Sequence, residues 1–304
     1  MKYRYPAMLH TMPKNLVIFG GFAIALILTV SIYGVLHARR VYVRQDPVVI
    51  EKSSSLPELK IALIADLHLG YNSTKSHVRK IVDTINSQNV DLVCIAGDLF
   101  DNDYDAIKDP DKVADILSGI KSRYGTYACW GNHDVSEKIL AGFTFPQKET
   151  IVRDGRFTKF LHHAGITMLE DETVCIDNAF YLVGRRDKDM AKKEQLLRKT
   201  FAEITEPLDP SLPIIVMDHQ PGELSEASDA GVDLDLSGHT HDGQMFPANL
   251  VIHFLWENAC GVLKKGSMTS IVTSGAGVWG PAMRVGTNNE VVIANVSFDP
   301  ATDQ

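Results

Sequence analysis

Apolar and polar positions along this chain change period in a way that predicts alternating strands and helices. The apolar run 61–65 is followed by apolar positions spaced three and four residues apart over 78–85, which predicts a strand and then an amphipathic helix. The run 90–96 is followed by a second stripe of this kind over 113–120. Two successive strand–helix units indicate an α/β architecture with parallel strands.

The second half of the chain adds more predicted strands. A hairpin is expected from 173–176 and 180–183, strands at 214–217, 234–236, 271–273 and 291–296, a helix near 188–201 and a long loop over 143–157. So many late strands imply a second sheet. We therefore expect two packed mixed β-sheets flanked by helices, a four-layer αββα sandwich.

Residues 16–36 carry no charged side chain. As a helix rising about 1.5 Å per residue, this run would cross the roughly 30 Å hydrocarbon core of a bilayer. A cleaved signal peptide would have an apolar region of only about 7–15 residues and a small-x-small cleavage site. Here the longer run leads into His37-Ala38-Arg39-Arg40. We predict one uncleaved transmembrane helix that makes the protein a single-pass protein of the cell membrane.

The anchor divides the chain into four expected parts. These are an N-terminal tail (1–15), the anchor (16–36), a juxtamembrane linker (37–58) that is polar and interrupted by prolines, and one large domain (59–304). Three Lys or Arg residues flank each end of the anchor, so the positive-inside rule leaves the side of the domain open. The short basic tail favours a cytoplasmic N-terminus and an extracytoplasmic domain.

Charge and cysteine content narrow the function classes. Beyond residue 44 there are 24 basic and 38 acidic side chains, a formal net charge of −14 that argues against nucleic-acid binding. The basic residues beside the anchor are expected to meet lipid headgroups. The four cysteines, Cys94, Cys129, Cys175 and Cys260, have no Cys-x-x-Cys spacing, which favours thiols without a disulfide framework.

Polar side chains with metal-binding chemistry follow five of the apolar runs. They are Asp66 and His68, Asp98, Asn132 to Asp134, His219, and His239 and His241. The carboxyl ends of neighbouring strands converge on one rim, where ligand sites of open α/β sheets lie. Residues two apart, such as Asp66 and His68, would point the same way in an extended chain. Mixed carboxylate and imidazole ligands suit Mn²⁺, Fe or Zn²⁺ rather than Ca²⁺.

The ordered series DLHLG, GDLFD, GNHD, MDHQP and SGHTHDGQ resembles the calcineurin-like metallophosphoesterase superfamily. The segments DHQP, SGHTHDGQMFP and SGAGVWGPAMRVG are similar to its bacterial membrane-associated phosphodiesterase-like branch. The resemblance covers residues 59–296. It implies a phosphoric ester hydrolase with two divalent metal ions.

The resemblance also implies a role for each matching residue. One metal would be held by Asp66, His68 and His241, the other by Asn132, His219 and His239, and Asp98 would bridge them. A metal-bound hydroxide would then cleave a phosphodiester or phosphomonoester bond. His133 would protonate the leaving oxygen, and Asp134 would fix its tautomer. Arg284 could bind the substrate's phosphate and Trp279 line the pocket, although a solvated Arg and a packed Trp fit as well.

One departure bears on the substrate. Protein phosphatases of this superfamily carry an Arg immediately before Gly-Asn-His, where this chain has Trp130. Small organic or lipid-linked phosphate esters are therefore favoured, and the anchor favours the lipid-linked ones. Two alternatives remain: a non-catalytic, membrane-tethered interaction module of the same fold, and a binuclear amide hydrolase.

Overall fold

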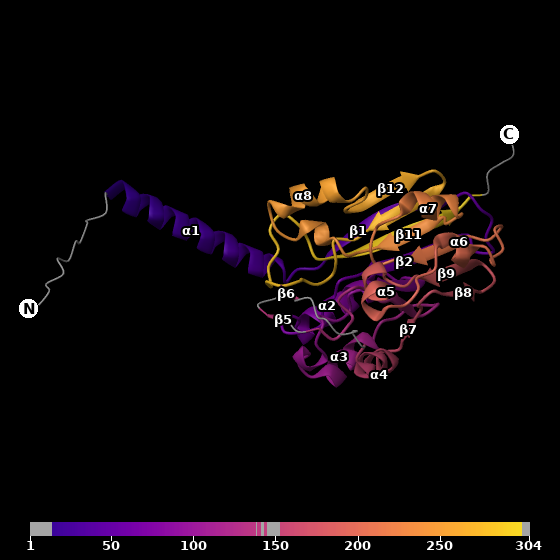
Figure 1. Cartoon of the computed structure of the whole chain (residues 1–304), viewed down its shortest axis with the longest axis horizontal. Helices are drawn as coiled ribbons and strands as arrows, with labels where there is room; N and C mark the ends of the chain where they lie inside the picture. Colours follow the sequence, from indigo (N-terminus) through magenta and orange to yellow (C-terminus); the bar gives the residue numbers. More distant parts are fainter. Residues whose placement is uncertain (1–13, 138, 141–142, 145–152, 300–304) are drawn as a thin grey trace, which may run out of the picture.

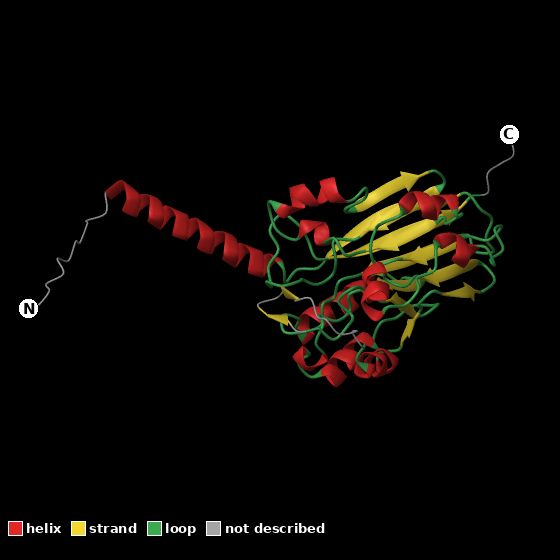
Figure 2. Cartoon of the chain, in the orientation of Figure 1, coloured by secondary structure: helices red, strands yellow, loops and turns green. Residues whose placement is uncertain are grey.

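Two six-stranded mixed sheets pack face to face and are covered on their outer sides by helices (Figures 1 and 2). The computed structural model describes residues 14–137, 139–140, 143–144 and 153–299. The four-layer α/β sandwich expected from the sequence is confirmed. Residues 1–13 of the expected N-terminal tail and 145–152 of the expected loop lie outside the described residues, whereas 14–15 belong to a helix and 155–157 begin another.

The first sheet has the strand order β1-β14-β2-β3-β4-β7. Its strands are β1 (Tyr42–Ile50), β14 (Glu290–Phe298), β2 (Glu58–Ile64), β3 (Leu92–Ala96), β4 (Thr126–Cys129) and β7 (Ile166–Met168). Strands β2, β3, β4 and β7 run parallel, β14 runs antiparallel to β2, and β1 runs parallel to β14. The carboxyl ends of β2, β3 and β4 therefore meet at one edge.

The second sheet has the order β12-β13-β11-β10-β9-β8. Its strands are β12 (Gly261–Lys265), β13 (Met268–Val272), β11 (Leu234–Ser237), β10 (Ile214–Met217), β9 (Phe180–Gly184) and β8 (Glu172–Ile176). The four central strands are parallel, and the outer strands β12 and β8 are antiparallel to their neighbours. The expected hairpin is thus confirmed as β8 and β9. A separate hairpin joins β5 (Ile139–Leu140) to β6 (Phe143–Thr144).

Strand alternation builds the core. In β3, Cys94 packs between the two sheets, whereas Val93 and Ile95 pack under the helices on the outer face. A strand buried on both faces reads as an unbroken apolar run, which is how these strands appear in the sequence. Cys94 and Cys129 are both fully buried, and all four cysteines are free thiols.

The helices form the two outer layers. They are α2 (Lys75–Ser87), α3 (Pro110–Leu117) and α4 (Gly155–His163) on the first sheet, and α5 (Lys188–Glu194), α6 (Phe201–Thr205), α7 (Leu224–Asp229) and α8 (Ala248–Leu255) towards the second. Helix α2 is capped by Thr74, whose side chain accepts a hydrogen bond from His77 N. The helix expected near 188–201 instead ends at Glu194, where Gln195 turns left-handed with φ 56°.

Helix α1 (Lys14–His37) projects from the domain as a separate rod (Figure 1). Among the described residues it is the one helix long and apolar enough to cross a bilayer. The segment expected to be a linker contains β1, which pairs over nine residues with β14 at the sheet edge. Burial in this strand alternates, with Val48 and Ile50 buried, and its central polar residues and Pro47 are what led to the assignment as a linker. The boundary of the domain at residue 59 stays a prediction.

Candidate metal centre

The predicted ligand residues lie where strands of both sheets end. Asp66 and Asp98 follow β2 and β3 in the first sheet, and Asn132 follows β4. His219 and His239 follow β10 and β11 in the second sheet. The packed sheets therefore bring residues far apart in the sequence to a single rim.

Five of the seven predicted ligands have a left-handed backbone. The φ angle is 56° at Asp66, 43° at His68, 50° at Asp98, 71° at His239 and 52° at His241. Non-glycine residues adopt such angles rarely, and they persist where the surrounding structure over-determines them, which is common at functional sites. The expected extended geometry is thus wrong: the side chains converge because the chain turns sharply just after each strand.

Asp66, His68 and His241 form the first of two donor clusters, here called the anchor-side cluster. His68 Nε2 lies 3.1 Å from His241 Nε2, which lies 3.6 Å from Asp66 Oδ1. All three residues are buried, and one donor atom from each falls within 4.8 Å of the others. Nitrogen ligands about 2.0–2.1 Å from a shared ion lie roughly 3–4 Å apart, so the cluster fits one cation.

Asp98, Asn132, His219 and His239 form the strand-side cluster. His219 Nε2 lies 3.1 Å from both Asp98 Oδ2 and Asn132 Oδ1. The same nitrogen lies 3.2 Å from His239 Nδ1. Asp98 Oδ2 is also 3.8 Å from His68 Nε2 of the other cluster. One carboxylate oxygen therefore lies between the two groups of donors.

Backbone contacts hold the strand-side cluster in place. His219 Nδ1 lies 2.8 Å from Ala96 O, so the ring donates there and presents Nε2 to the cluster. A Cβ atom on Gly131 would lie 2.2 Å from Asp98 Oδ1, a clash that any other residue at this position would meet. The glycine of the GNHD motif is thus required by close approach to the carboxylate.

Burial and neighbouring charges shift the pKa values of these groups. Burial lowers the pKa of His239 to about 3 and that of His241 well below the ordinary value, and it raises the pKa of Asp66 to about 6. At His219 burial is outweighed by the neighbouring Asp98 carboxylate, which raises its pKa. Neutral imidazoles are the form that binds metal ions, so His239 and His241 are ready to act as ligands.

His133 lies beside the clusters. Its backbone N–H donates to Asp98 Oδ1 at 2.8 Å, and its Nδ1 contacts Asn102 Oδ1. The expectation that Asp134 fixes the tautomer of His133 is wrong. Asp134 Oδ2 accepts from Gly131 N at 2.7 Å and Oδ1 from Phe100 N at 2.8 Å, so this carboxylate stabilises the loop, and Asn102 holds the ring. Burial lowers the pKa of His133 to about 4.

Arg284 does not face the rim. Its side chain is fully buried and donates to the carbonyl oxygens of Ser274 at 2.6 Å, Gly277 at 2.8 Å and His241 at 3.1 Å. The suggested contact with the substrate's phosphate is corrected accordingly, because the side chain is buried and both of its terminal nitrogens, Nη1 and Nη2, already have acceptors inside the protein. Arg284 instead holds the backbone of an anchor-side donor.

Two site residues, Asp101 and Asn102, were not predicted, and the sequence left Trp256 open as either a pocket or a core residue. Asn102 contacts His133, Asp101 Oδ1 lies 3.4 Å from His68 Nδ1, and the Trp256 ring centroid lies 5.3 Å from that of His239. Asp101 and Asn102 follow Asp98 closely, which was an available signal. Trp256 directly follows helix α8, and tertiary packing places its ring at the rim, which makes it a site residue. Trp279, which was suggested as a pocket residue, lies with its ring centroid 6.1 Å from that of His133.

Comparison with known proteins adds relatives of similar sequence. A metallophosphoesterase of uncharacterised activity from Helicobacter pylori is 32% identical over 82% of this chain and 62% of its own length. A transmembrane protein with a metallophosphoesterase domain from Danio rerio is 29% identical over 90% of this chain and 62% of its own length. The chain therefore spans about three-fifths of these relatives.

Among solved structures, an archaeal phosphodiesterase aligns with a TM-score of 0.37 at 14% identity, covering 72% of this chain and 85% of that one. The sequence pattern of the calcineurin-like phosphoesterase family matches residues 59–243, which include all seven predicted ligands. With five motif-bearing strand ends converging on one buried set of donors, the chain belongs to the calcineurin-like metallophosphoesterase family.

Proposed function

We propose that the two clusters hold two divalent cations and that the protein is a membrane-anchored enzyme that hydrolyses phosphoester bonds. Asp66, His68 and His241 would hold one ion. Asn132, His219 and His239 would hold the other. Asp98 would bridge the two, and its carboxylate oxygen between the clusters is the observation that carries the proposal. The donor set is compatible with Mn²⁺, Fe or Zn²⁺.

Charge supports this assignment. Two divalent cations bring four positive charges to a rim with two ligand carboxylates, Asp66 and Asp98. The remaining five donors are imidazoles and an amide, which are neutral as ligands. The site would keep a net positive charge, which attracts a phosphate ester.

The reaction is the cleavage of a phosphodiester or phosphomonoester by water. When bound, the two ions lower the pKa of a coordinated water and polarise the phosphoryl oxygens. His133 would serve the leaving oxygen: with Nδ1 held by Asn102, its Nε2 is the ring atom that exchanges a proton with the substrate. Asp134 keeps the loop that carries His133 in shape through its two backbone contacts.

The substrate is proposed to be a lipid-linked phosphate ester. Trp130 is buried and lies under Arg153, whose guanidinium carbon is 4.5 Å from the ring centroid, so its ring supplies no phosphate contact at the rim. This supports an activity other than protein dephosphorylation. Helix α1 would hold the catalytic rim close to the bilayer, where a lipid phosphate is concentrated.

The test measures hydrolysis of bis-p-nitrophenyl phosphate and p-nitrophenyl phosphate by the full chain in detergent. Turnover should require Mn²⁺ or another divalent ion and disappear after chelation. Phenyl phosphate is added as a monoester whose leaving group is poorer than that of p-nitrophenyl phosphate. A His133→Ala variant should lose more activity on phenyl phosphate, because a poorer leaving group depends more on proton transfer. A folded protein that binds no divalent ion and turns over neither ester would favour the interaction module. Cleavage of amides alone would favour the amide hydrolase.

The domain is proposed to lie outside the cytoplasm, on the weak charge bias of the N-terminal flank. Cys175 on β8 is exposed and offers a direct test. In intact cells a membrane-impermeant maleimide should label this thiol, and a Cys175→Ser variant should lose that labelling. Labelling only after the cells are lysed would place the domain on the cytoplasmic side.

A further inference from the structure

A cavity of about 510 Å³ lies where helix α1 meets the domain. Its walls come from the end of α1, from residues 72–80 around the start of α2, and from the segment 277–282. Leu67, His68 and Asn289 complete the lining. Since His68 also belongs to the anchor-side cluster, the cavity extends from the anchor to the candidate metal centre.

The cavity keeps a fixed position relative to α1. Arg284 N donates to Gly34 O at 3.1 Å, Asn289 Nδ2 donates to Ala38 O, and His37 Nε2 lies 3.1 Å from Thr287 O. These bonds tie the last turn of α1 to the segment 284–289. If α1 spans the bilayer, the mouth of the cavity therefore opens at the membrane surface.

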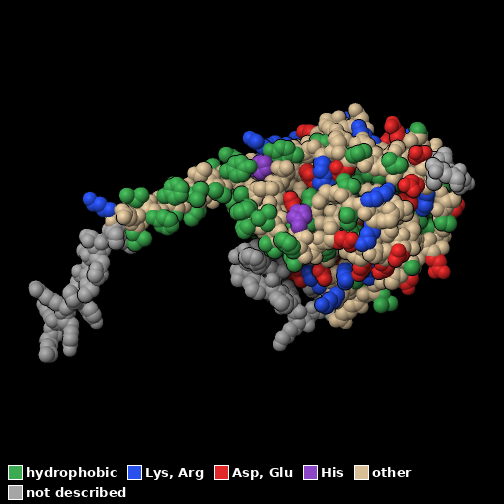
Figure 3. Space-filling model, turned by 90° about the horizontal axis from the view of Figure 1, so that it is seen from above, with side chains coloured by type: hydrophobic (Ala, Val, Ile, Leu, Met, Phe, Trp, Pro, Cys, Tyr) green, Lys and Arg blue, Asp and Glu red, His purple; other side chains and the backbone are tan. Residues whose placement is uncertain are grey.

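Other apolar side chains gather around this junction. Phe246 N donates to Val285 O. The Val285 side chain lies against Gly34 of α1, so Phe246 is close to the junction. From Phe246 onward, α8 exposes further apolar side chains, including Phe254 at 87%. Seen from above, hydrophobic side chains run along α1 and continue onto the adjoining part of the domain (Figure 3). Such a face suits the headgroup region of a bilayer.

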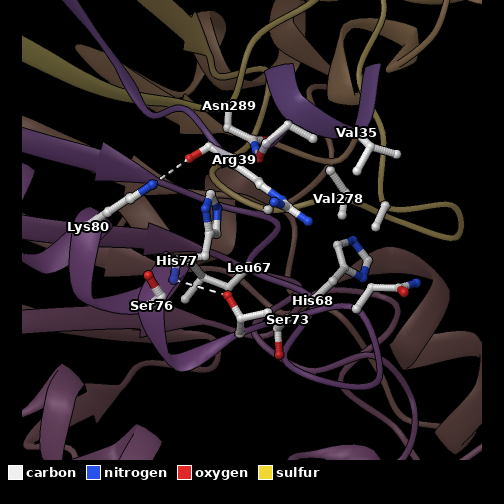
Figure 4. Close-up of a pocket in the computed structure, with 15 residues that line it drawn as sticks. Val35, Arg39, Leu67, His68, Ser73, Ser76, His77, Lys80, Val278 and Asn289 are labelled. Carbon is white, nitrogen blue, oxygen red and sulfur yellow. Dashed lines mark hydrogen bonds between the residues drawn. The ribbon is translucent and has the colours of Figure 1, made fainter. Parts of the chain in front are cut away.

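Two cations stand at this cavity without a carboxylate partner. Among the residues that the structure describes, neither Arg39 nor Lys80 forms an ion pair, and Lys80 Nζ donates to Arg39 O at 3.1 Å. In the close-up, the Arg39 side chain points into the space between His77 and Val278 (Figure 4). By contrast, Arg44 is engaged inside the domain with Asp46 and Glu290. Arg39 and Lys80 are therefore available to an anion from outside.

The remaining lining divides by polarity. Val35, Val278 and Ala282 give an apolar wall beside α1, whereas Asn72, Ser73 and His77 give a polar wall at the start of α2. Arg39 follows the end of α1 by two residues and Lys80 is bonded to its carbonyl oxygen, so an α1 that spans the bilayer would leave Arg39 near the headgroups. A molecule with an anionic head and an apolar tail matches both walls at once.

We propose that this cavity binds the phosphate-bearing headgroup of an anionic lipid and passes it to the metal centre past His68. Arg39 and Lys80 would hold the phosphate, and the acyl chain would leave past Val35 and Val278 into the bilayer. The proposal rests on the proposed function for the fate of the lipid, and it assigns the substrate class of that site. Binding itself requires no metal ion.

The test uses the full chain in phosphatidylcholine nanodiscs after chelation, so that binding is measured without hydrolysis. The probe is a dioctanoyl phosphatidic acid with a diazirine on one acyl chain, crosslinked by light and mapped by mass spectrometry. Saturable adducts are expected on the end of α1 or on 277–282. An Arg39→Ala, Lys80→Ala double variant should weaken binding roughly tenfold or more, since both charges facing the phosphate are lost.

Three controls make the result specific. Arg79→Ala removes an exposed cation next to Lys80 that does not line the cavity, and it should leave binding unchanged. Ala282→Trp keeps both cations but fills the space, and it should abolish the adducts while the melting temperature reports folding. Inorganic phosphate should compete poorly because it has no acyl chain. Dioctanoyl phosphatidylcholine should compete poorly because its choline cation neutralises and covers the phosphate charge.

The outcomes separate the two proposals. Adducts spread evenly along α1, or binding indifferent to the double variant and to Ala282→Trp, would overturn the lipid site. Equal competition by inorganic phosphate would also overturn it, in favour of a free-phosphate site. The unsubstituted full chain is assayed in parallel on the soluble diester. Turnover without cavity binding removes this inference alone, whereas cavity binding without any turnover retains the lipid site and removes the hydrolase.

Discussion

The two donor clusters of the candidate metal centre are supported in different ways. The strand-side cluster rests on neighbouring strand ends: His219 is bonded to the last residue of β3, and Asp98 accepts from the backbone after β4. The anchor-side cluster rests on a late segment, because Arg284 holds the His241 backbone and Gly277 N donates to Asp66 O. That same segment is bonded to α1. Among the described residues, the anchor-side cluster is therefore the one whose supporting segment is bonded to α1.

The largest effect is expected where the two clusters meet. Asp98→Ala should remove the shared carboxylate and reduce soluble-diester turnover by about three orders of magnitude or more, because several kcal/mol of transition-state stabilisation are lost. Metal analysis should find fewer than two ions per chain. A variant that keeps two ions and near-normal turnover would contradict the bridging role of Asp98.

Arg284→Lys should affect the anchor-side cluster selectively. A lysine cannot replace the planar guanidinium that donates to three carbonyl oxygens, so the affinity for one of the two ions should fall about 10–100-fold. Titration with Mn²⁺ should then resolve one tight and one weak site. Arg153→Lys, at the ion pairs with Glu170 and Glu194, is the matched control and should leave both sites tight. Equal weakening of both sites would remove the distinction between the clusters.

Gly34→Leu tests the connection to α1. A Cβ at Gly34 would lie 2.9 Å from Met283 Cε and 3.0 Å from Val285 Cγ2, so a larger side chain should displace the segment next to Arg284. We expect a severalfold loss of turnover rather than abolition, since the atoms it meets belong to side chains that can move. Gly21→Leu, on the same helix with nothing within 4 Å, should have no effect. Identical behaviour of the two variants would show that the junction does not influence the site.

Asp235→Asn should produce the smallest effect, on stability alone. Asp235 lies in β11, where Ser270 Oγ donates to it at 2.9 Å, and burial raises its pKa to about 7. A raised carboxyl pKa contributes stability fully below the unfolded pKa of 3.8, and this contribution is lost as the pH rises towards 7. The variant should therefore lose less stability than the unsubstituted protein between pH 4 and 7 in thermal melts. An unchanged pH profile would contradict this.

Much of the strand-side cluster could be anticipated from local sequence. Each of its residues comes two or three positions after the end of an apolar strand, and parallel strands place their carboxyl ends together, so the rim follows from pattern and topology. The support of the anchor-side cluster could not be anticipated in this way. Arg284 looked like a phosphate ligand because sequence reveals its charge but not its acceptors, and the acceptors are carbonyl oxygens of remote segments.

The errors around His133 and β1 have the same origin. Asp134 follows His133 directly, yet its oxygens turn to backbone amides, and Asn102 reaches the ring from another loop. The segment 42–50 was assigned to a linker because polar residues and Pro47 interrupt its apolar positions, but pairing with β14, nearly 250 residues away, makes it an edge strand. Adjacency in sequence was a poor guide wherever the partner came from elsewhere in the fold.

By itself, the sequence determined the apolar anchor, the sandwich class, the family and the residues that form the two clusters, because period, spacing and motif order are local properties. The tertiary structure alone decided that the ligands turn left-handed, that Arg284 is buried, and that a cavity joins α1 to His68. These depend on which distant segments pack together. Packing is settled by the whole chain and leaves no signature in any single stretch of it.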